Sequence, residues 1–255
     1  MRRILRHHPL PREAWQQVAH CAPALQGLNA VESARLRELA TVFVYRKSFS
    51  GARGLDVTPA MAVAVAAQAC LLILHLGLDY YDGWREIILY PGAFRVRREE
   101  RDAGGLVYEQ ERDLTGESWS RGPVVLSWDD VVRDTYHGRP GHNVVLHEFA
   151  HKLDALNGAA NGMPPLHADM NVEQWAAALS DAYGALRRQL QAGHPGYVDE
   201  YAATNPGEFF AVLSEYFFTA PHVLQVHCPA AHEQLALFYR GRAARPPLGQ
   251  PPLAG

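Results

Sequence analysis

Two histidines and a glutamate stand close together at positions 147, 148 and 151, in the pattern His-Glu-x-x-His. On an α-helix, residues four apart lie one turn above each other, so His147 and His151 present two imidazoles that one metal ion can bridge. Glu148 lies next to them, where its carboxylate could take a proton from a metal-bound water. The pattern is typical of the zinc-binding helix of peptidases. The alternative is an ordinary amphipathic helix with two histidines on its polar face.

The residues around this motif predict that it lies on a helix. Asn143 is a good N-cap residue, apolar residues occupy the other faces, and Asn157-Gly158 is a typical helix exit. Asp154 falls on the same face as the histidines, so its carboxylate could accept the second N–H of a metal-binding imidazole. The alternative role for Asp154 is a solvated position at the surface.

A catalytic zinc ion usually has three protein ligands and one water, so a third ligand must come from another segment. Residues 205–218 predict a helix that begins with Asn205 as N-cap and Pro206 at the first helical position. Glu208 and Glu215 lie about two turns apart on one face of it, among apolar residues. Spacing alone allows either glutamate to be the ligand, and Glu208 could instead form a capping box with Asn205. Further alternatives, which no spacing supports, are Cys228, His142, His167 and His194.

The composition indicates a globular protein of the cytoplasm. The chain has 255 residues, of which 48% are hydrophobic and 10% aromatic, and this is enough for a substantial core. A net charge of -3 gives no general attraction to phosphate backbones, so binding to nucleic acid is not indicated. Three widely separated cysteines favour neither a disulfide framework nor a Cys-rich zinc site, and no signal peptide is recognisable. We therefore expect a reducing compartment.

The N-terminal part, to about residue 80, predicts helices. Residues 29–32 resemble a capping box, and residues 36–43 are apolar at helical spacing. Residues 60–78 contain no charged side chain and are about long enough to cross a bilayer. However, Gln68 and His75 interrupt this run, and no aromatic belt or basic cluster flanks it. We interpret it as a buried core helix and expect no membrane span.

Residues 84–128 predict short strands separated by Gly-, Pro- and charge-rich connections. The last strand, residues 122–128, leads into the helix that carries His147. Zinc peptidases commonly bind the substrate backbone along a sheet edge, so this strand could receive a peptide by strand addition. It could also be a strand without any substrate contact. Two further helices are expected at 171–191 and 229–240, and residues 242–255 are rich in Pro and Gly, which predicts a disordered tail.

Long segments of the chain resemble the Mlc titration factor A family of bacterial zinc metallopeptidases. The matching segments are residues 57–72, 116–128, 143–154 and 208–218. The resemblance implies a zincin-like α+β fold, helix-rich with a small mixed sheet, similar to the protease domain of anthrax lethal factor. We accordingly expect residues 1–241 to form a single metallopeptidase domain, with a helical part to about residue 80 and a catalytic core after it.

The resemblance also assigns roles to individual residues. The metal ligands that it implies for one Zn²⁺ per chain are His147, His151 and Glu208. It thereby selects Glu208 over Glu215, and it makes Glu148 the catalytic base. A family tyrosine that assists catalysis corresponds to Tyr201, with Tyr197 as a weaker match. A phenol at that position could donate a hydrogen bond to the developing oxyanion.

The family resemblance implies an aminopeptidase-like activity on peptide substrates and binding to the glucose-responsive transcriptional repressor Mlc. The alternative is a non-enzymatic repressor-binding module that retains the zincin architecture. An aminopeptidase also needs a group that binds the free α-amine of its substrate, usually a carboxylate. The available carboxylates, among which spacing selects none, are Glu117, Asp129, Asp130 and Asp199.

Overall fold

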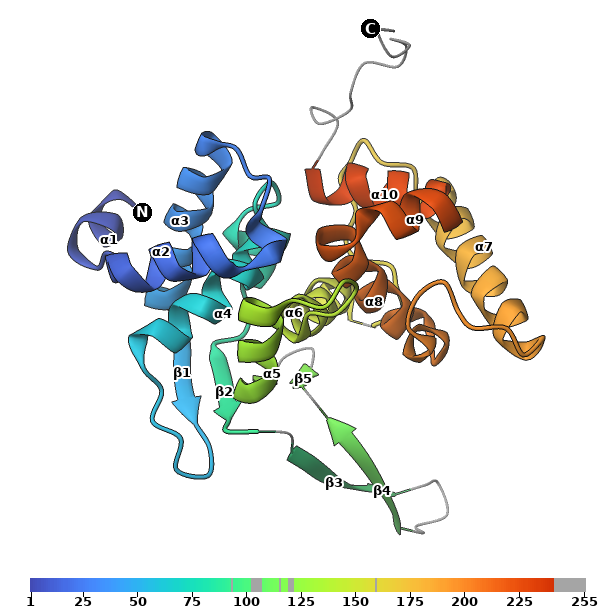
Figure 1. The fold of residues 1–255 in the computed structure, drawn as a ribbon, viewed down its shortest axis with the longest axis horizontal. Coiled ribbons are helices and arrows are strands. Elements are labelled where there is room, and N and C mark those ends of the chain that lie inside the picture. Colours follow the sequence, from blue (N-terminus) through green and yellow to red (C-terminus); the bar gives the residue numbers. More distant parts are fainter. Residues whose placement is uncertain (93, 102–106, 115, 119–121, 159, 241–255) are drawn as a thin grey trace, which may run out of the picture.

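The computed structural model describes residues 1–92, 94–101, 107–114, 116–118, 122–158 and 160–240. It is a helix-rich α+β structure in which two groups of helices lie on either side of helix α6 (Val144–Asp154) (Figure 1). The N-terminal group consists of α1 (Arg2–His7), α2 (Arg12–Cys21), α3 (Ala30–Arg46) and α4 (Pro59–Leu72). The C-terminal group consists of α7 (Val172–Gln191), α8 (Pro206–Thr219), α9 (Pro221–His227) and α10 (Pro229–Arg240). The predicted tail at 242–255 lies outside the described residues.

The N-terminal helices form where the sequence predicts them. Asn29 caps α3 through its side-chain oxygen, and the Glu32 carboxylate accepts the N–H of Asn29, which completes the predicted capping box. In α4, every residue from Met61 to Leu72 is buried. The charge-free run is therefore a core helix, although the helix ends at Leu72 and not at residue 78. Within the described ranges, no helix is both long and apolar enough to cross a membrane.

A four-stranded sheet lies beside these helices, with the strand order β1-β2-β6-β5. Its strands are β1 (Ser48–Gly51), β2 (Glu86–Tyr90), β6 (Val124–Ser127) and β5 (Gly116–Ser118). The first three are parallel, and β5 runs antiparallel to β6, with Glu117 opposite Val125. The prediction that a peptide adds to residues 122–128 is wrong, because β5 folds back and occupies that edge of β6. The two outer strands of the sheet are β1 and β5, and β5 contacts α6. A separate hairpin consists of β3 (Phe94–Arg101) and β4 (Val107–Leu114).

One continuous cluster of buried apolar side chains joins both groups of helices through α6. Phe149 projects from α6 into this core, where its ring centroid lies 5.8 Å from that of Phe43, 5.2 Å from Tyr81 and 5.7 Å from Trp84. Tilted and edge-on aromatic pairs of this kind each contribute about 0.5–1.5 kcal/mol beyond the burial of their area. The apolar face of α6 is therefore held in the core, and the opposite face is left for the histidines.

Lys152 connects α6 to the chain segment that precedes β6. Its side chain is buried, its Nζ donates to the carbonyl oxygen of Gly122 at 2.7 Å, and the same atom lies 5.1 Å from the centroid of Trp84. Burial lowers the pKa of the Lys152 ammonium to about 8. A buried cation that is held in this way fixes the distance between the helix and the sheet.

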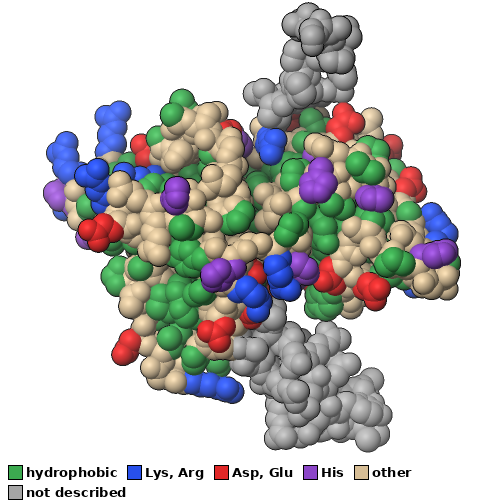
Figure 2. All heavy atoms as spheres, in the orientation of Figure 1, with side chains coloured by type: hydrophobic (Ala, Val, Ile, Leu, Met, Phe, Trp, Pro, Cys, Tyr) green, Lys and Arg blue, Asp and Glu red, His purple; other side chains and the backbone are tan. Residues whose placement is uncertain are grey.

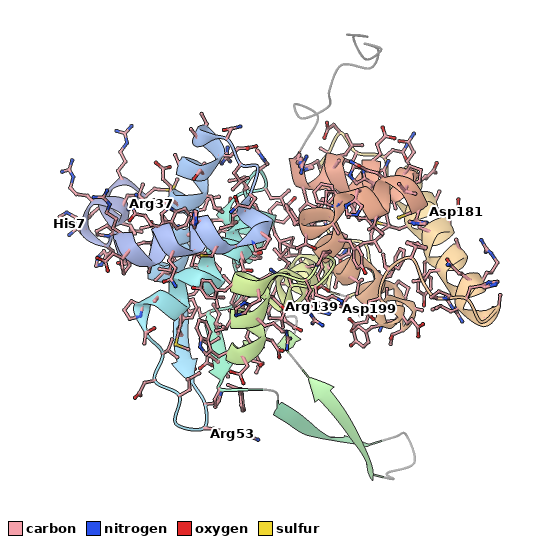
Figure 3. The ribbon with its side chains drawn as sticks, in the orientation of Figure 1. His7, Arg37, Arg53, Arg139, Asp181 and Asp199 are labelled. Atoms are coloured by element: carbon pink, nitrogen blue, oxygen red, sulfur yellow. The ribbon has the colours of Figure 1, made fainter. Side chains whose placement is uncertain are left out.

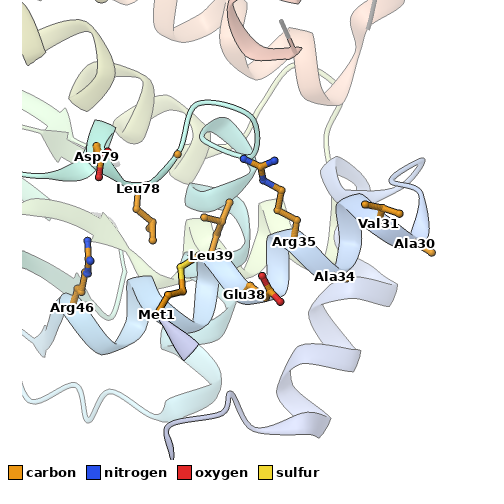
Figure 4. A pocket seen from close by; sticks show the side chains of 11 residues that line it. Met1, Ala30, Val31, Ala34, Arg35, Glu38, Leu39, Arg46, Leu78 and Asp79 are labelled. Carbon is orange, nitrogen blue, oxygen red and sulfur yellow. The ribbon is translucent and has the colours of Figure 1, made fainter. Parts of the chain in front are cut away.

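The surface of the N-terminal group carries a hollow of about 820 Å³. Its walls include Met1, Val31, Leu39 and Leu78, as Figure 4 shows from close by. No residue of α6 or α8 lines it. The hollow is therefore separate from the helices that carry the His-Glu-x-x-His motif and Glu208.

The chain segment that leads into α6 passes close to Tyr216 of α8 at Gly141. This close contact can be tested by substitution. Gly141 has φ +79°, and a Cβ atom there would lie 2.3 Å from Cζ of Tyr216, whereas Gly193 has φ +76° and nothing within 4 Å. Alanine costs about 1–2 kcal/mol at either φ, but only Gly141→Ala adds overpacking of about 1–3 kcal/mol. We expect urea denaturation to show a larger loss of unfolding free energy for Gly141→Ala than for Gly193→Ala. Equal losses of unfolding free energy in the two variants would contradict tight packing of Tyr216 against Gly141.

Candidate metal centre

Three possible metal-binding atoms from two helices lie close together in a triangle. His147 and His151 project from α6, and Glu208 projects from the first turn of α8. The Nε2 atom of His147 lies 3.1 Å from Oε2 of Glu208 and 3.2 Å from Nε2 of His151. The third side of the triangle, from Nε2 of His151 to Oε2 of Glu208, measures 3.1 Å. The structure therefore brings together the two histidines of the motif and the glutamate that the family resemblance selects.

The size of this triangle suits a metal ion. Ligand bonds of about 2.0–2.1 Å in tetrahedral geometry separate neighbouring ligand atoms by about 3.3 Å. The three donor atoms therefore have nearly the spacing of one face of a coordination tetrahedron, so these residues could hold one metal ion. The side chains of His147, His151 and Glu208 are each between 14% and 16% exposed, so the group can be reached from solvent.

The charges of the cluster also suit a cation. Burial acts to lower the pKa of His147, but hydrogen bonds with Glu208 and Glu215 raise it well above its ordinary value. Burial acts to raise the pKa of Glu208, but hydrogen bonds from the two imidazoles hold it well below its usual range. The Glu208 carboxylate is therefore ionised at neutral pH and can compensate the charge of a divalent ion. Protons and metal compete for the imidazole nitrogens, so metal binding weakens in acid.

Glu215 contacts His147 on the side away from the other two donors. Its Oε1 lies 2.8 Å from Nδ1 of His147, and its Oε2 accepts the backbone N–H of Asn143. When Nε2 of an imidazole binds a metal, Nδ1 carries the proton and donates it to such a partner, which fixes the tautomer and the ring orientation. The two glutamates that spacing could not separate thus face different nitrogen atoms of the same ring. This arrangement favours Glu208 as ligand and Glu215 as the group that orients the ligand.

The first turn of α6 is held by side chains from other segments. Asn143 caps the helix as predicted, since its Oδ1 accepts the N–H three residues on. Its Nδ2 donates to Gln68 of α4 at 2.6 Å, and Gln68 in turn donates to Thr135 at 2.8 Å. Asp134 accepts the N–H of the first residue of α6 at 2.9 Å. Sequence reasoning missed Gln68, Thr135 and Asp134, although an amide within a charge-free apolar helix is a signal that a buried partner exists.

Asp154 does not have either of the roles that we considered. It is completely buried, so it is not a solvated surface residue, and its Oδ2 accepts the backbone N–H of Gly162 at 2.7 Å. Its Oδ1 has no hydrogen-bond partner among the described residues. The chain turns back after Gly158 and brings Gly162 within reach of the carboxylate, so Asp154 holds this loop and not an imidazole. Burial raises the pKa of Asp154 to about 6.

A cavity of about 250 Å³ opens beside the donor atoms. His147, Glu148 and Tyr201 contribute to its wall, and Glu148 is only 4% exposed. The charged and titratable residues that line the rest are Asp130, Arg133, Asp134, Arg139, His142, Asp199 and Glu215. Figure 2 shows acidic, basic and histidine side chains gathered where the two halves of the molecule meet, and Figure 3 labels Arg139 and Asp199 in this region.

The two candidate tyrosines have different surroundings. Tyr201 lies on the 3-10 turn η5 (Glu200–Ala203), is 46% exposed, and has its ring centroid 6.1 Å from that of His147. Tyr197 donates its hydroxyl to the carbonyl of Ala182 at 3.1 Å and stacks on His227. Of these two tyrosines, Tyr201 lines the cavity beside the candidate metal ligands and Tyr197 does not. The geometry therefore favours Tyr201 as the residue that approaches a substrate.

The other candidate ligands lie elsewhere. His142 lines the cavity, but it is not part of the metal-binding group. His167 uses its Nε2 in a hydrogen bond with the carbonyl of Phe238 at 2.9 Å, and Cys228 is buried. In the part of the chain that the structure describes, only His147, His151 and Glu208 meet closely enough to bind one ion.

A His-His-Glu group on two helices is a site of the kind that metallopeptidases use, and comparisons with known proteins assign the chain to that class. The model of the glucose-regulated metallo-peptidase M90 family matches residues 1–240. Mlc titration factor A of Klebsiella pneumoniae (strain 342) is 38% identical over 228 residues, which cover 89% of this chain and 85% of that protein. Mlc titration factor A of Yersinia pestis (strain Pestoides F) is 39% identical over 221 residues, covering 86% and 81% respectively. The chain therefore belongs to the Mlc titration factor A family of glucose-regulated M90 metallo-peptidases.

The two glutamates of α8 should differ in their effect on metal binding. We expect Glu208→Gln to lose most of the bound metal, as His147→Ala and His151→Ala should, because each removes one of three protein ligands. Glu215→Gln should weaken binding by about 10–100-fold, because it only disturbs the orientation of His147. Chelator competition measures these affinities, and Glu173→Gln, at an exposed position of α7, is the control. A greater loss in Glu215→Gln than in Glu208→Gln would exchange their roles.

Proposed function

We propose that the chain is a zinc-dependent aminopeptidase of the zincin type, which binds one Zn²⁺ through His147, His151 and Glu208. The observation that carries the proposal is the triangle of donor atoms next to an accessible cavity, whose wall includes His147 and Glu148. Imidazole ligands favour zinc over magnesium and calcium, which prefer oxygen. The helix-rich fold with its small mixed sheet supports the likeness to the protease domain of anthrax lethal factor. The continuous core supports treating residues 1–241 as one domain.

Each residue of the proposed site has a separate role in peptide hydrolysis. Bound zinc would supply a Lewis acid and would lower the pKa of a bound water. Glu148 accepts a proton from the attacking water and returns it to the leaving amine. Tyr201 donates a hydrogen bond to the oxyanion that develops on the scissile carbonyl. Glu215 accepts the proton of His147 Nδ1 in a hydrogen bond and so keeps the imidazole oriented.

The role of Glu148 can be separated from metal binding. We expect Glu148→Gln to retain zinc and to lose peptidase turnover by about 10²–10⁴-fold, because the amide preserves the shape of the side chain but cannot accept a proton. Turnover of a peptide substrate and zinc content should be measured on the same preparation. Undiminished turnover in this variant would remove Glu148 from the mechanism.

The aminopeptidase assignment concerns the N-terminus of the substrate. The cavity is small, about 250 Å³, and carboxylates are part of its wall. We expect short peptides or amino-acid anilides with a free N-terminus to be hydrolysed faster than their N-acetylated forms, and folded proteins to be poor substrates. Rates with and without a chelator test this. Equal rates on free and acetylated peptides would exclude the aminopeptidase while leaving a zinc endopeptidase.

The name of the relatives favours a second function. "Mlc titration factor A" describes proteins that titrate Mlc, and we propose that this chain binds a transcriptional repressor of that kind. The binding would accompany peptidase activity or, in the alternative function, replace it.

The two functions respond differently to loss of catalysis. We expect Glu148→Gln to bind the repressor with unchanged affinity, because a binding surface tolerates the loss of a proton acceptor at a distant site and hydrolysis does not. Isothermal titration calorimetry with the purified Mlc-like repressor of the same organism measures the affinity. Loss of binding in this variant would show that the repressor engages the catalytic cavity.

A further inference from the structure

The structure narrows the choice of the group that binds the substrate's α-ammonium. Of the four carboxylates that the sequence offers, Asp130 and Asp199 line the cavity beside the metal cluster. Asp129 is exposed and is not part of the cavity wall. The side chain of Glu117 lies outside the described part of the structure. The candidates for an ammonium-binding group are therefore the carboxylates that line the cavity.

Most carboxylates of this cavity already have another role. Asp130 accepts a hydrogen bond from the guanidinium of Arg133 on its Oδ1. Asp134 accepts a backbone N–H at the start of α6 and also faces Arg133, at 3.5 Å. Glu215 uses one oxygen for His147 and the other for a backbone N–H. Glu148 is the proposed base. Arg133 thus compensates the charge of Asp130 and Asp134, and two donors bind Glu215. Glu148 is required for proton transfer.

Asp199 differs because its side chain is exposed to solvent and one of its oxygens has no hydrogen-bond partner among the described residues, whereas the side chains of Asp130 and Asp134 are buried. Its Oδ1 accepts the N–H of Tyr201 at 2.9 Å. Its Oδ2 lies 4.0 Å from Nε2 of His142, which is beyond hydrogen-bond distance, and the side chain is 40% exposed. Arg139 lines the same cavity, but no ion pair joins it to Asp199 among the described residues. An accessible carboxylate oxygen thus lies at the wall of the catalytic cavity.

The position of Asp199 also suits the reaction. Its hydrogen bond to Tyr201 fixes the start of η5, and this turn carries the tyrosine whose ring lies 6.1 Å from that of His147. Asp199 and Tyr201 therefore act on the same part of the cavity. A substrate whose N-terminal ammonium binds Asp199 would have its first peptide bond close to Tyr201 and the metal ligands. This relation is the one that an aminopeptidase requires.

We propose that Oδ2 of Asp199 binds the α-ammonium group of the peptide substrate and thereby sets the preference for a free N-terminus. The inference rests on the proposed peptidase function and names the residue that determines its specificity. The contact is a charge-assisted hydrogen bond between an ammonium donor and a carboxylate acceptor. Acetylation of the substrate removes the positive charge and adds a carbonyl oxygen, so an acetylated peptide cannot make this contact.

The test substitutes Asp199→Asn in the zinc-loaded protein. Asparagine keeps the oxygen that accepts the N–H of Tyr201, so the turn η5 is preserved while the negative charge is removed. We expect kcat/KM for a peptide with a free N-terminus to fall about tenfold or more, as is common when one partner of a charge pair is lost. The value for the N-acetylated peptide should not change, so the ratio between the two substrates should fall towards one.

Two matched variants serve as controls. Asp129→Asn changes an exposed carboxylate outside the cavity and should leave the substrate ratio unaltered. Asp130→Asn tests the rival, because Oδ2 of Asp130 is buried without a hydrogen-bond partner among the described residues. Zinc content should be measured for every variant. Binding of the free and acetylated peptides to the Glu148→Gln variant, with and without Asp199→Asn, measures the same preference when turnover is absent.

The outcomes separate this inference from the proposed function. A proportional loss on both substrates in Asp199→Asn would show that Asp199 acts only through Tyr201, and it would overturn the assignment. A change of preference in Asp130→Asn but not in Asp199→Asn would move the ammonium site to Asp130. Equal rates of the wild-type protein on both peptides would overturn the ammonium site and leave the peptidase standing. Hydrolysis of neither peptide by the zinc-loaded protein would remove both proposals.

Discussion

The carboxylate of Glu215 joins the two helices on which the metal site depends. It accepts a hydrogen bond at the start of α6, from Asn143, and lies against His147 one turn further along the same helix. These two contacts of one carboxylate fix the position of α6 along its axis and its rotation about that axis, relative to α8. Because Glu208 lies on α8 as well, its Oε2 is held at 3.1 Å from the Nε2 atoms of both histidines. Leaving a buried group of this kind unpaired would cost about 1–3 kcal/mol, so the helices are strongly constrained to this arrangement.

The opposite face of α6 is fixed by interactions of another kind. Phe149 packs among three aromatic rings of the N-terminal half, and Lys152 reaches the chain before β6. Gln68 of α4 holds Asn143 through its side-chain amide. The helix therefore has little freedom to rotate or slide. A catalytic metal site benefits from this rigidity, because ligands that are held in place before the metal binds do not need to be ordered on binding.

Sequence reasoning succeeded where the cause is local. Helix caps and the His-Glu-x-x-His spacing depend on residues within a few positions of each other, and the structure confirms the predicted caps at Asn29, Asn143 and Asn205. Glu208 and Glu215 could not be separated by spacing because they share one face of α8. The difference arises from the way α8 crosses α6, which brings its first turn to Nε2 of His147 and a later turn to Nδ1. Likewise, the pairing of β5 with β6 and the contact of Asp154 with Gly162 depend on the direction in which the chain leaves an element, which the spacing of residues within that element does not predict.

X-ray absorption spectroscopy at the zinc K-edge of the purified, zinc-loaded protein tests the central claim most directly. We expect about one zinc per chain, with a first shell of nitrogen and oxygen at about 2.0–2.1 Å and the outer-shell scattering of two imidazole rings. The His151→Ala variant should retain the scattering of at most one ring. A sulfur ligand at about 2.3 Å, or zinc bound without imidazole scattering, would contradict a site built from His147, His151 and Glu208.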